Sequence, residues 1–534
     1  MTAIRSKAMG VPIWAGALIS AGFLLFGQAA SIFSQNAPLP KSSNAGKLIA
    51  PHVAALRVTL PDTELRPPKN TVRNEISDCE ECAKEGYVRP APADFIKDAN
   101  WVRLSDGSHV LKIEFESRNA GGLRIKFAGE LPLRVALQAY DLNGAVIGPF
   151  DPSAMYNEEA VPPLKPEKTW WAPTIWGEVA GLEWHVRAGL PLPKHLPKMV
   201  AIAYLYNDQP GLGADGMSGS ELPCHLDVSC FAQWANEATA VARMKFIKGT
   251  TSFVCTGFLI NRVPSDSAPV FLTAAHCISH QDVANTLELY WLYQRSTCNG
   301  SLPGLNSVPR TSAALILKLH INADECLLGL YQPPPVNFFP DWDVGNTASW
   351  ATGDPATAIS HPAGTHKRIA FGKKGGDGSR PFDLDTGTFP IINVWDINFE
   401  NLGVVEPGSS GCPIFDSNHK VRGTLTGGYS FTGCPPITYH WGRLEYAWSN
   451  MKYFLENMAS PTYVDRTVSG DSNNNGDSER GTTSNPFNTL REATYCVRAG
   501  DNVLIAPGNY NEQFRLWRPM TLKANGGAVT LGPP

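Results

Sequence analysis

The stretch Glu406-Pro-Gly-Ser-Ser-Gly-Cys-Pro413 contains a serine pair between two glycines. Glycine adopts backbone angles that other residues avoid, so Gly408 and Gly411 permit a tight turn. In such a turn the backbone N–H groups of Gly408 and Ser410 can point the same way and stabilise a developing oxyanion. Ser410 is therefore a candidate nucleophile. The alternative is an ordinary surface loop, because turns rich in glycine and serine are common.

A candidate base lies upstream, in Val270-Phe-Leu-Thr-Ala-Ala-His-Cys277. The apolar run predicts a buried strand that ends in a small-residue turn, which leaves His276 at the strand's end. A serine hydroxyl becomes a strong nucleophile only when a neighbouring base takes its proton. Since the pKa of an imidazole suits that step near neutral pH, His276 is the candidate base. The alternative is a structural histidine beside a disulfide.

Two motifs together resemble the histidine and serine boxes of chymotrypsin-like serine peptidases. They are Thr273-Ala-Ala-His-Cys277 and Gly408-Ser-Ser-Gly-Cys-Pro413. Over roughly residues 215–458, further motifs are similar to those of the bacterial lysyl-endopeptidase-like branch. The resemblance implies a double six-stranded β-barrel that cleaves peptide bonds of protein or peptide substrates by a Ser-His-Asp triad, through an acyl-enzyme, with no metal or organic cofactor. These further motifs are Gly219-Ser-Glu-Leu-Pro-Cys-His-Leu-Asp-Val-Ser-Cys230, Cys255-Thr-Gly-Phe-Leu-Ile-Asn261, Glu406-Pro-Gly-Ser-Ser-Gly411 and Trp441-Gly-Arg443.

The acid of the triad has two possible placements. Aligning Thr311-Ser-Ala-Ala-Leu-Ile-Leu317 with the family's acid box would put Ala313 at the acid position and imply a damaged enzyme. Aligning Ala323-Asp-Glu-Cys-Leu-Leu-Gly-Leu330 instead restores an aspartate before a Leu-Leu pair, so we expect Asp324 to orient the base. The order histidine, aspartate, serine then matches the chymotrypsin type.

The expected specificity pocket departs from the family pattern. In lysyl endopeptidases an aspartate two residues before the Tyr-Gly-Arg box pairs with the substrate lysine, and Tyr439 occupies that position here. Thr426 replaces the family's histidine ahead of Gly427 and Gly428. Without a carboxylate, nothing in the pocket offsets the desolvation of a lysine ammonium. We therefore expect the lysine preference to be lost and an uncharged residue, including an apolar one, to be accepted.

Eight of the eleven cysteines lie in the region that carries these motifs. Cys326 and Cys412 each follow a proposed triad member by two residues, and side chains two apart on a strand share a face. This spacing suggests that the two cysteines approach each other and bond. Cys496 is expected to be unpaired or buried. The disulfides that the resemblance implies are Cys224–Cys434, Cys230–Cys298 and Cys255–Cys277.

Composition points to a mostly β, multidomain globular protein. A chain of 534 residues exceeds the usual size of one hydrophobic core. Its 48 glycines and 43 prolines favour turns between short strands. The formal charge of −4 gives no overall basic field that would favour a nucleic-acid partner, and we expect a monomer.

The N-terminus has the pattern of a secretory signal. Arg5 and Lys7 precede an uncharged run from Ala8 to Pro40, which predicts a cleaved signal peptide over 1–30 and a secreted or periplasmic protein. An uncleaved membrane anchor is the alternative. Residues 31–89 are expected to form a poorly ordered leader, in which Cys79 and Cys82 form a structural disulfide, local or with another cysteine, rather than a metal site.

From residue 90 onward, the chain is expected to divide into five segments. Alternating apolar residues over 90–208, with Asn143-Gly144 as a hairpin turn, predict a small β-sandwich, which resembles the prosegments of such enzymes. The tail resembles the first coils of a pectate-lyase-type β-helix. A non-catalytic protease-fold binding protein, with the tail contacting a polysaccharide or cell surface, is the alternative function. The expected segments are the sandwich at 90–208, a linker at 209–220, the protease domain at 221–458, a polar linker at 459–485 and the tail at 486–534.

Overall fold

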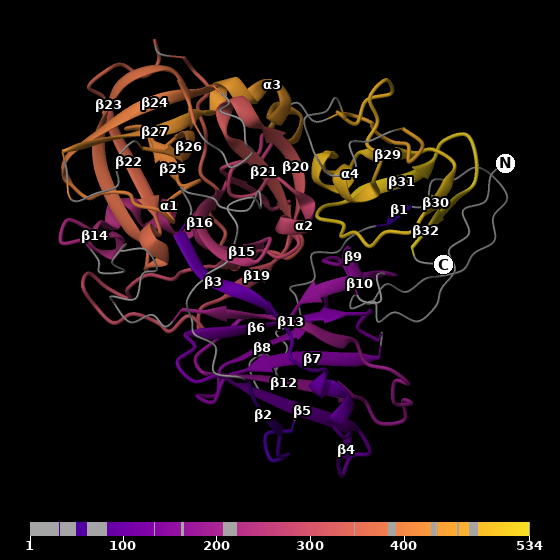
Figure 1. The fold of residues 1–534 in the computed structure, drawn as a ribbon. Coiled ribbons are helices and arrows are strands. Elements are labelled where there is room, and N and C mark those ends of the chain that lie inside the picture. Colours follow the sequence, from indigo (N-terminus) through magenta and orange to yellow (C-terminus); the bar gives the residue numbers. More distant parts are fainter. Residues whose placement is uncertain are drawn as a thin grey trace.

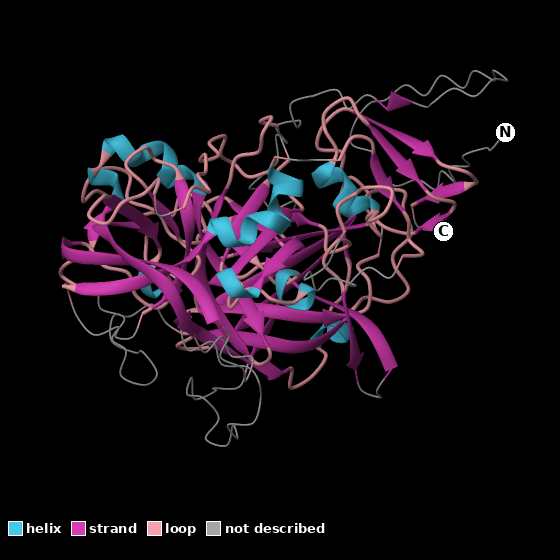
Figure 2. Ribbon diagram, turned by 90° about the horizontal axis from the view of Figure 1, so that it is seen from above, coloured by secondary structure: helices cyan, strands magenta, loops and turns pink. Residues whose placement is uncertain are grey.

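The computed structural model is mostly β, as predicted, and its helices are short (Figure 2). It describes residues 31–32, 48, 50–60 and 83–532, except for 133, 162–164, 207–221, 267, 347, 383–390, 429–433, 435, 457–458 and 469–478. The expected signal peptide, Cys79, Cys82 and the linker at 209–220 therefore lie outside the described residues. Within the described part, no helix is both long and apolar enough to cross a bilayer.

The N-terminal domain is a two-sheet sandwich, drawn in indigo and purple in Figure 1. Aromatic side chains from both sheets fill its core, where the ring of Phe127 lies 4.7 Å from that of Trp170 and 5.6 Å from that of Trp184. Asn143-Gly144 lies in the turn between β7 and β8, and the positive φ of Gly144 (94°) suits that turn. One sheet contains β2 (Leu56–Thr59), β4 (Val102–Arg103), β5 (His109–Glu116), β7 (Val135–Tyr140), β8 (Val146–Phe150) and β12 (Val179–Val186); the other contains β6 (Gly122–Ala128), β9 (Asn157–Val161), β10 (Lys165–Trp171), β11 (Ile175–Trp176) and β13 (Lys198–Leu205).

The prediction of a poorly ordered leader over 31–89 was wrong for three segments that form strands, which are β1 (Ser31–Ile32), β2 and β3. Strand β2 lies parallel to β5, and β3 (Ala83–Pro90) is inserted between β13 of the sandwich and β16 of the protease domain. A close approach makes this possible, because a Cβ on Gly86 would lie only 2.2 Å from the carbonyl oxygen of Tyr204. The sandwich and the first barrel therefore share one continuous sheet (Figure 1).

The protease domain consists of two barrels. The second barrel is closed by pairing in the order β23-β22-β25-β26-β27-β24-β23, and β14 (Leu226–Asp227) extends it. The first barrel wraps around its own apolar core in the order β19-β18-β15-β16-β17-β21-β20. Its strands are β15 (Val241–Lys248), β16 (Thr251–Leu259), β17 (Val270–Thr273), β18 (Glu288–Tyr290), β19 (Arg310–Ser312), β20 (Ala314–His320) and β21 (Glu325–Leu330). Those of the second are β22 (Pro355–Ser360), β23 (Arg368–Pro381), β24 (Ile391–Leu402), β25 (Pro413–Phe415), β26 (Val421–Gly427) and β27 (Ile437–Arg443).

Short helices lie on the outside of the barrels, and α3 packs against the outer side of the first barrel. Helix α3 buries one apolar stripe, including Met451 and Phe454, in a core cluster that continues into the tail. The helices of this domain are η3 (Val228–Cys230), η4 (Ala232–Trp234), α1 (Ala235–Ala240), α2 (Gln281–Ala284), η5 (Ile321–Ala323), η6 (Pro362–Gly364) and α3 (Leu444–Leu455); the sandwich has η1 (Phe95–Asp98).

The tail, yellow in Figure 1, stacks one coil on the next. β29 (Asn502–Ile505) lies parallel to β31 (Met520–Ala524), and β30 (Gly508–Tyr510) lies parallel to β32 (Val529–Leu531). β28 (Thr462–Val464) lies parallel to β29 and so corrects the linker prediction for 459–485. β1 (Ser31–Ile32) pairs with β31.

A helix in the tail, α4 (Leu490–Cys496), was not predicted from the sequence. Its N-terminus has the Thr-x-x-Glu spacing of a capping box; here the backbone N–H of Glu492 donates to Thr489 Oγ1, and the Thr489 hydroxyl donates to the Glu492 carboxylate at 2.7 Å. The signal was therefore present in Thr489-Leu-Arg-Glu492.

Candidate active site

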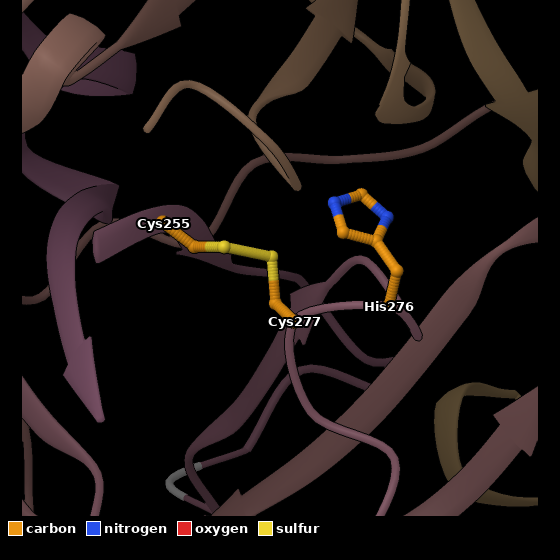
Figure 3. Close-up of side chains that lie close together, drawn as sticks. All are labelled: Cys255, His276 and Cys277. Carbon is orange, nitrogen blue, oxygen red and sulfur yellow. A yellow bond between two sulfur atoms is a disulfide. The ribbon is translucent and has the colours of Figure 1, made fainter. Parts of the chain in front are cut away.

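The turn that carries His276 follows β17 and is held by a disulfide. Cys255 of β16 and Cys277 are bonded, and Figure 3 shows their disulfide beside the imidazole. The donor atoms of Cys255, His276 and Cys277 lie within 4.8 Å of one another, a spacing that could suggest a metal site. Because both sulfurs are in the disulfide, neither is a thiolate, so this group cannot bind a metal as three ligands.

Asp324 lies directly against His276. Its Oδ1 accepts a hydrogen bond from the His276 backbone N–H at 2.9 Å, and its Oδ2 lies 2.8 Å from His276 Nδ1. The strands explain this meeting, because β17 ends just before His276, β21 begins just after Asp324, and Thr273 is paired with Cys326. The structure therefore brings Asp324, and not Ala313, to the imidazole; Ala313 packs in the core of the N-terminal domain.

The backbone of Asp324 has an unusual conformation, and hydrogen bonds to its carbonyl oxygen hold it in place. It has a positive φ of 50°, which non-glycine residues rarely adopt, although aspartate tolerates it better than most. Its carbonyl oxygen accepts hydrogen bonds from the backbone N–H of Ala275 (3.1 Å) and from Thr424 Oγ1 (3.3 Å). These bonds join the acid to both the histidine turn and the second barrel.

The loop that carries Ser410 is held against the same edge of the first barrel. The Ser410 carbonyl accepts a hydrogen bond from the backbone N–H of Thr256 (2.9 Å), and Thr256 Oγ1 donates to the carbonyl of Gly408 (2.9 Å). Gly408 and Gly411 have positive φ values of 97° and 80°. A Cβ on Gly411 would lie 2.3 Å from Thr273 Oγ1, so only glycine lets the serine loop approach the end of β17.

A second carboxyl lies beside Asp324 but differs in environment. Glu325 is fully buried, and neither of its carboxyl oxygens has a hydrogen-bond partner in the described part of the chain. Burial raises the pKa of Glu325 well above its ordinary value, and the charge of Asp324 raises it further. Burial therefore favours the neutral form of Glu325, whereas the carboxylate of Asp324 contacts the histidine.

The residues of the expected specificity pocket lie on the neighbouring strands β26 and β27, and Gly428 directly follows β26. Tyr439 is buried in the core of the second barrel, and a Cβ on Gly428 would lie 2.5 Å from its ring. Thr426 is also buried, and Gly427 is paired with His440 on β27. Gly428 is therefore packed directly on the ring of Tyr439, the position at which the family pattern has an aspartate.

All three disulfides that the resemblance implied are present: Cys224–Cys434, Cys230–Cys298 and Cys255–Cys277. The predicted contact between Cys326 and Cys412 was wrong, because both are buried free thiols. Cys326 faces the core of the first barrel and Cys412 that of the second. Asp324, Ser410 and Cys412 lie in turns ahead of β21 and β25, so the rule for side chains two apart on a strand does not apply to these pairs. Cys496 is a third buried free thiol.

Some residues that support this site were assigned no role from the sequence, although Thr256 lies in the Cys255–Asn261 motif. Thr256 contacts the serine loop at two points, and the turn at His361–Gly364 lies behind it, where the backbone N–H of Ala363 donates to the carbonyl of Pro407 (2.7 Å). These contacts join residues far apart in the sequence, so no spacing could have revealed them.

Comparison with known proteins agrees with this architecture. Residues 216–439 match the model of the lysyl endopeptidase C-terminal domain, and residues 86–196 match that of the lysyl endopeptidase N-terminal domain. Residues 471–529 match a protein family of unknown function (DUF1565).

Individual relatives include a lysyl endopeptidase of Pseudomonas aeruginosa, 29% identical over 66% of this chain and 75% of the relative. A secreted RxLR effector protein of Plasmopara viticola is 29% identical over 39% of this chain and 50% of the relative. Among solved structures, the active form of the Rv3671c protease from M. tuberculosis is 17% identical, with a TM-score of 0.30 over 43% of this chain and 90% of that chain. Deg5 is 14% identical, with a TM-score of 0.29 over 42% and 92%.

The two barrels and the matched domains define a chymotrypsin-like serine endopeptidase, a hydrolase that acts on proteins or peptides. Within that class the chain resembles the lysyl endopeptidases, in its N-terminal domain as well as in its protease domain.

Proposed function

We propose that the chain cleaves peptide bonds by a triad of Ser410, His276 and Asp324, through an acyl-enzyme. The observation that carries this proposal is the pair of contacts from the Asp324 carboxylate to His276, at 2.9 and 2.8 Å, on a turn against which the serine loop packs. Asp324 orients the imidazole and stabilises its protonated form, and His276 takes the proton of Ser410 as the hydroxyl attacks the scissile carbonyl. The amides of Gly408 and Ser410 stabilise the tetrahedral oxyanion.

The preference for lysine is lost in this proposal. A lysine ammonium needs a buried carboxylate to offset its desolvation, and at the relevant position the chain has Tyr439, whose ring packs under Gly428. An uncharged side chain fits this environment better. A peptide library measures the preference directly, and cleavage products that end mainly in lysine would contradict this part of the proposal.

Secretion is also part of the proposal. It rests on the charge pattern of the first 40 residues, on three disulfides and on a relative that is described as secreted. Maturation by cleavage after a basic residue is not expected near Gly216–Ser220, because no lysine or arginine lies between Met199 and Ser220. N-terminal sequencing of the secreted protein would show whether the sandwich domain is removed.

A fluorophosphonate probe tests catalysis most directly, because it reacts with an activated serine. We expect one labelled site, lost in Ser410→Ala. Ser417→Ala is the matched control, since Ser417 is exposed in the turn after β25. Absence of labelling in correctly processed protein would favour the alternative of a catalytically impaired binding protein.

A further inference from the structure

Arg243 is a buried cation at the boundary between the N-terminal domain and the first barrel. It lies on β15 with 2% of its surface exposed. Its guanidinium forms an ion pair with Glu85 of β3, a strand of the N-terminal region. The guanidinium also lies 5.3 Å from the ring of Trp176, which belongs to the N-terminal domain, and 5.4 Å from the ring of Tyr290. A buried guanidinium depends on such a counter-charge, because desolvation of an unpaired charge is costly.

The other side of Arg243 faces the turn at His361–Gly364. Its Nε donates a hydrogen bond of 2.7 Å to the carbonyl of Gly364. Within this turn Ala363 has a positive φ of 49°, so neighbouring contacts must hold its conformation. One of these contacts is the bond from the Ala363 N–H to the Pro407 carbonyl at 2.7 Å.

This turn forms the rear support of the loop that carries the proposed oxyanion hole. A Cβ on Gly408 would lie 3.0 Å from the backbone nitrogen of Gly364 and 3.1 Å from that of Ala363. Thr256 Oγ1 connects the two segments, because it accepts from the His361 N–H (3.0 Å) and donates to the Gly408 carbonyl (2.9 Å). The position of the Gly408 peptide is therefore set by the turn behind it.

We propose that Arg243 is a positioning residue for the oxyanion hole, and that the N-terminal domain stabilises it through Glu85. The path runs from Glu85 to Arg243, to the Gly364 carbonyl, and through the Ala363 and Thr256 contacts to Gly408. It rests on the proposed function, and it gives β3 a role in catalysis although no residue of β3 belongs to the triad. Donors of an oxyanion hole act only when they are correctly aimed, so a shift of the turn lowers the rate without abolishing substrate binding.

The test measures the rate constant and the amplitude of fluorophosphonate labelling on protein made from the full chain. Intact mass first shows whether residues 83–90 are retained, and labelling at the full rate after their removal would overturn the role of Glu85. Arg243→Lys keeps the charge but loses the planar guanidinium that contacts Gly364 and Glu85 together. Glu85→Gln keeps the shape but removes the counter-charge. Thr174→Val is the matched control, because Thr174 donates from the N-terminal domain to the buried Glu288 at the same interface without touching Arg243.

We expect full labelling amplitude in all variants, with the rate constant lowered about 10- to 100-fold in Arg243→Lys and about 10-fold in Glu85→Gln. With a peptide substrate, kcat should fall with little change in KM, and Thr174→Val should stay within about twofold of the unmodified protein. Unchanged rate constants, or a loss of amplitude alone, would show a purely structural role and overturn the inference. If the unmodified chain is not labelled at all, the proposed function itself fails, and this inference fails with it.

Discussion

Asp324 contacts His276 with both carboxylate oxygens, Oδ1 at 2.9 Å from the backbone nitrogen and Oδ2 at 2.8 Å from Nδ1. One contact fixes the turn and the other fixes the imidazole. In Asp324→Asn an amide NH₂ group can face Nδ1, which favours the wrong tautomer of the histidine. We expect kcat to fall by about 10³- to 10⁴-fold, measured by ester hydrolysis, while labelling of Ser410 becomes correspondingly slow.

The control for this substitution is the adjacent residue. Glu325→Gln changes a buried carboxyl of the same strand start, and glutamine mimics the neutral acid that burial favours. It should keep kcat within about twofold. Equal loss of activity in both variants would mean that the effect comes from packing around β21, not from the carboxylate of Asp324.

The raised pKa of Glu325 also predicts how the free energy of unfolding depends on pH. Its folded-state pKa is raised well above the ordinary value of 4.5, so the folded chain holds a proton that the unfolded chain releases. The free energy of unfolding should therefore fall as the pH rises from about 4.5 towards the folded-state pKa, by about 1.4 kcal/mol per pH unit. Glu325→Gln should remove this loss. Denaturant titrations at pH 4 and pH 7 test it, with the two proteins similar at pH 4 and the variant more stable at pH 7; a gap independent of pH would contradict it.

The disulfide of Cys255 and Cys277 should matter for both stability and activity. It closes a loop with a sequence separation of 22, for which chain entropy alone gives about 3 kcal/mol. The double substitution Cys255→Ser with Cys277→Ser should lower the free energy of unfolding by about that amount and loosen the turn that carries His276. Urea denaturation gives the first effect and kcat the second. Cys326→Ala, a buried free thiol in the same barrel, serves as the control for packing.

The sequence predicted that Asp324 contacts His276, and the structure shows this contact because β17 and β21 are neighbouring strands. Sequence-based prediction failed where residues meet only through tertiary packing. The strand β3 carries Gly86 and few apolar residues, so nothing local marked it as the link between two domains. The Cys326 and Cys412 thiols illustrate the same limit, because a spacing of two residues does not say which barrel core each side chain enters.

The tail packs on the strand that follows the proposed acid, and this contact yields the last prediction. The hydroxyl of Tyr495 donates to the carbonyl of Leu330 at 2.6 Å, and a Cβ on Gly329 would lie 2.7 Å from its ring. Gly329→Ala should displace the ring and lower the free energy of unfolding by about 1–3 kcal/mol. Gly304→Ala is the matched control, because a Cβ there would meet no atom within 4 Å.

The same variant decides whether the tail is a separate unit or part of the protease fold. Tyr495 shares its apolar cluster with α3 and with Leu327 of β21, so a displaced ring should loosen the whole tail. Limited proteolysis should then release the segment after residue 458 faster from Gly329→Ala than from Gly304→Ala. Equal cleavage rates would mean that the tail is held by other contacts. Faster release together with a lower kcat would show that the tail supports β21, and through it the orientation of Asp324 towards His276.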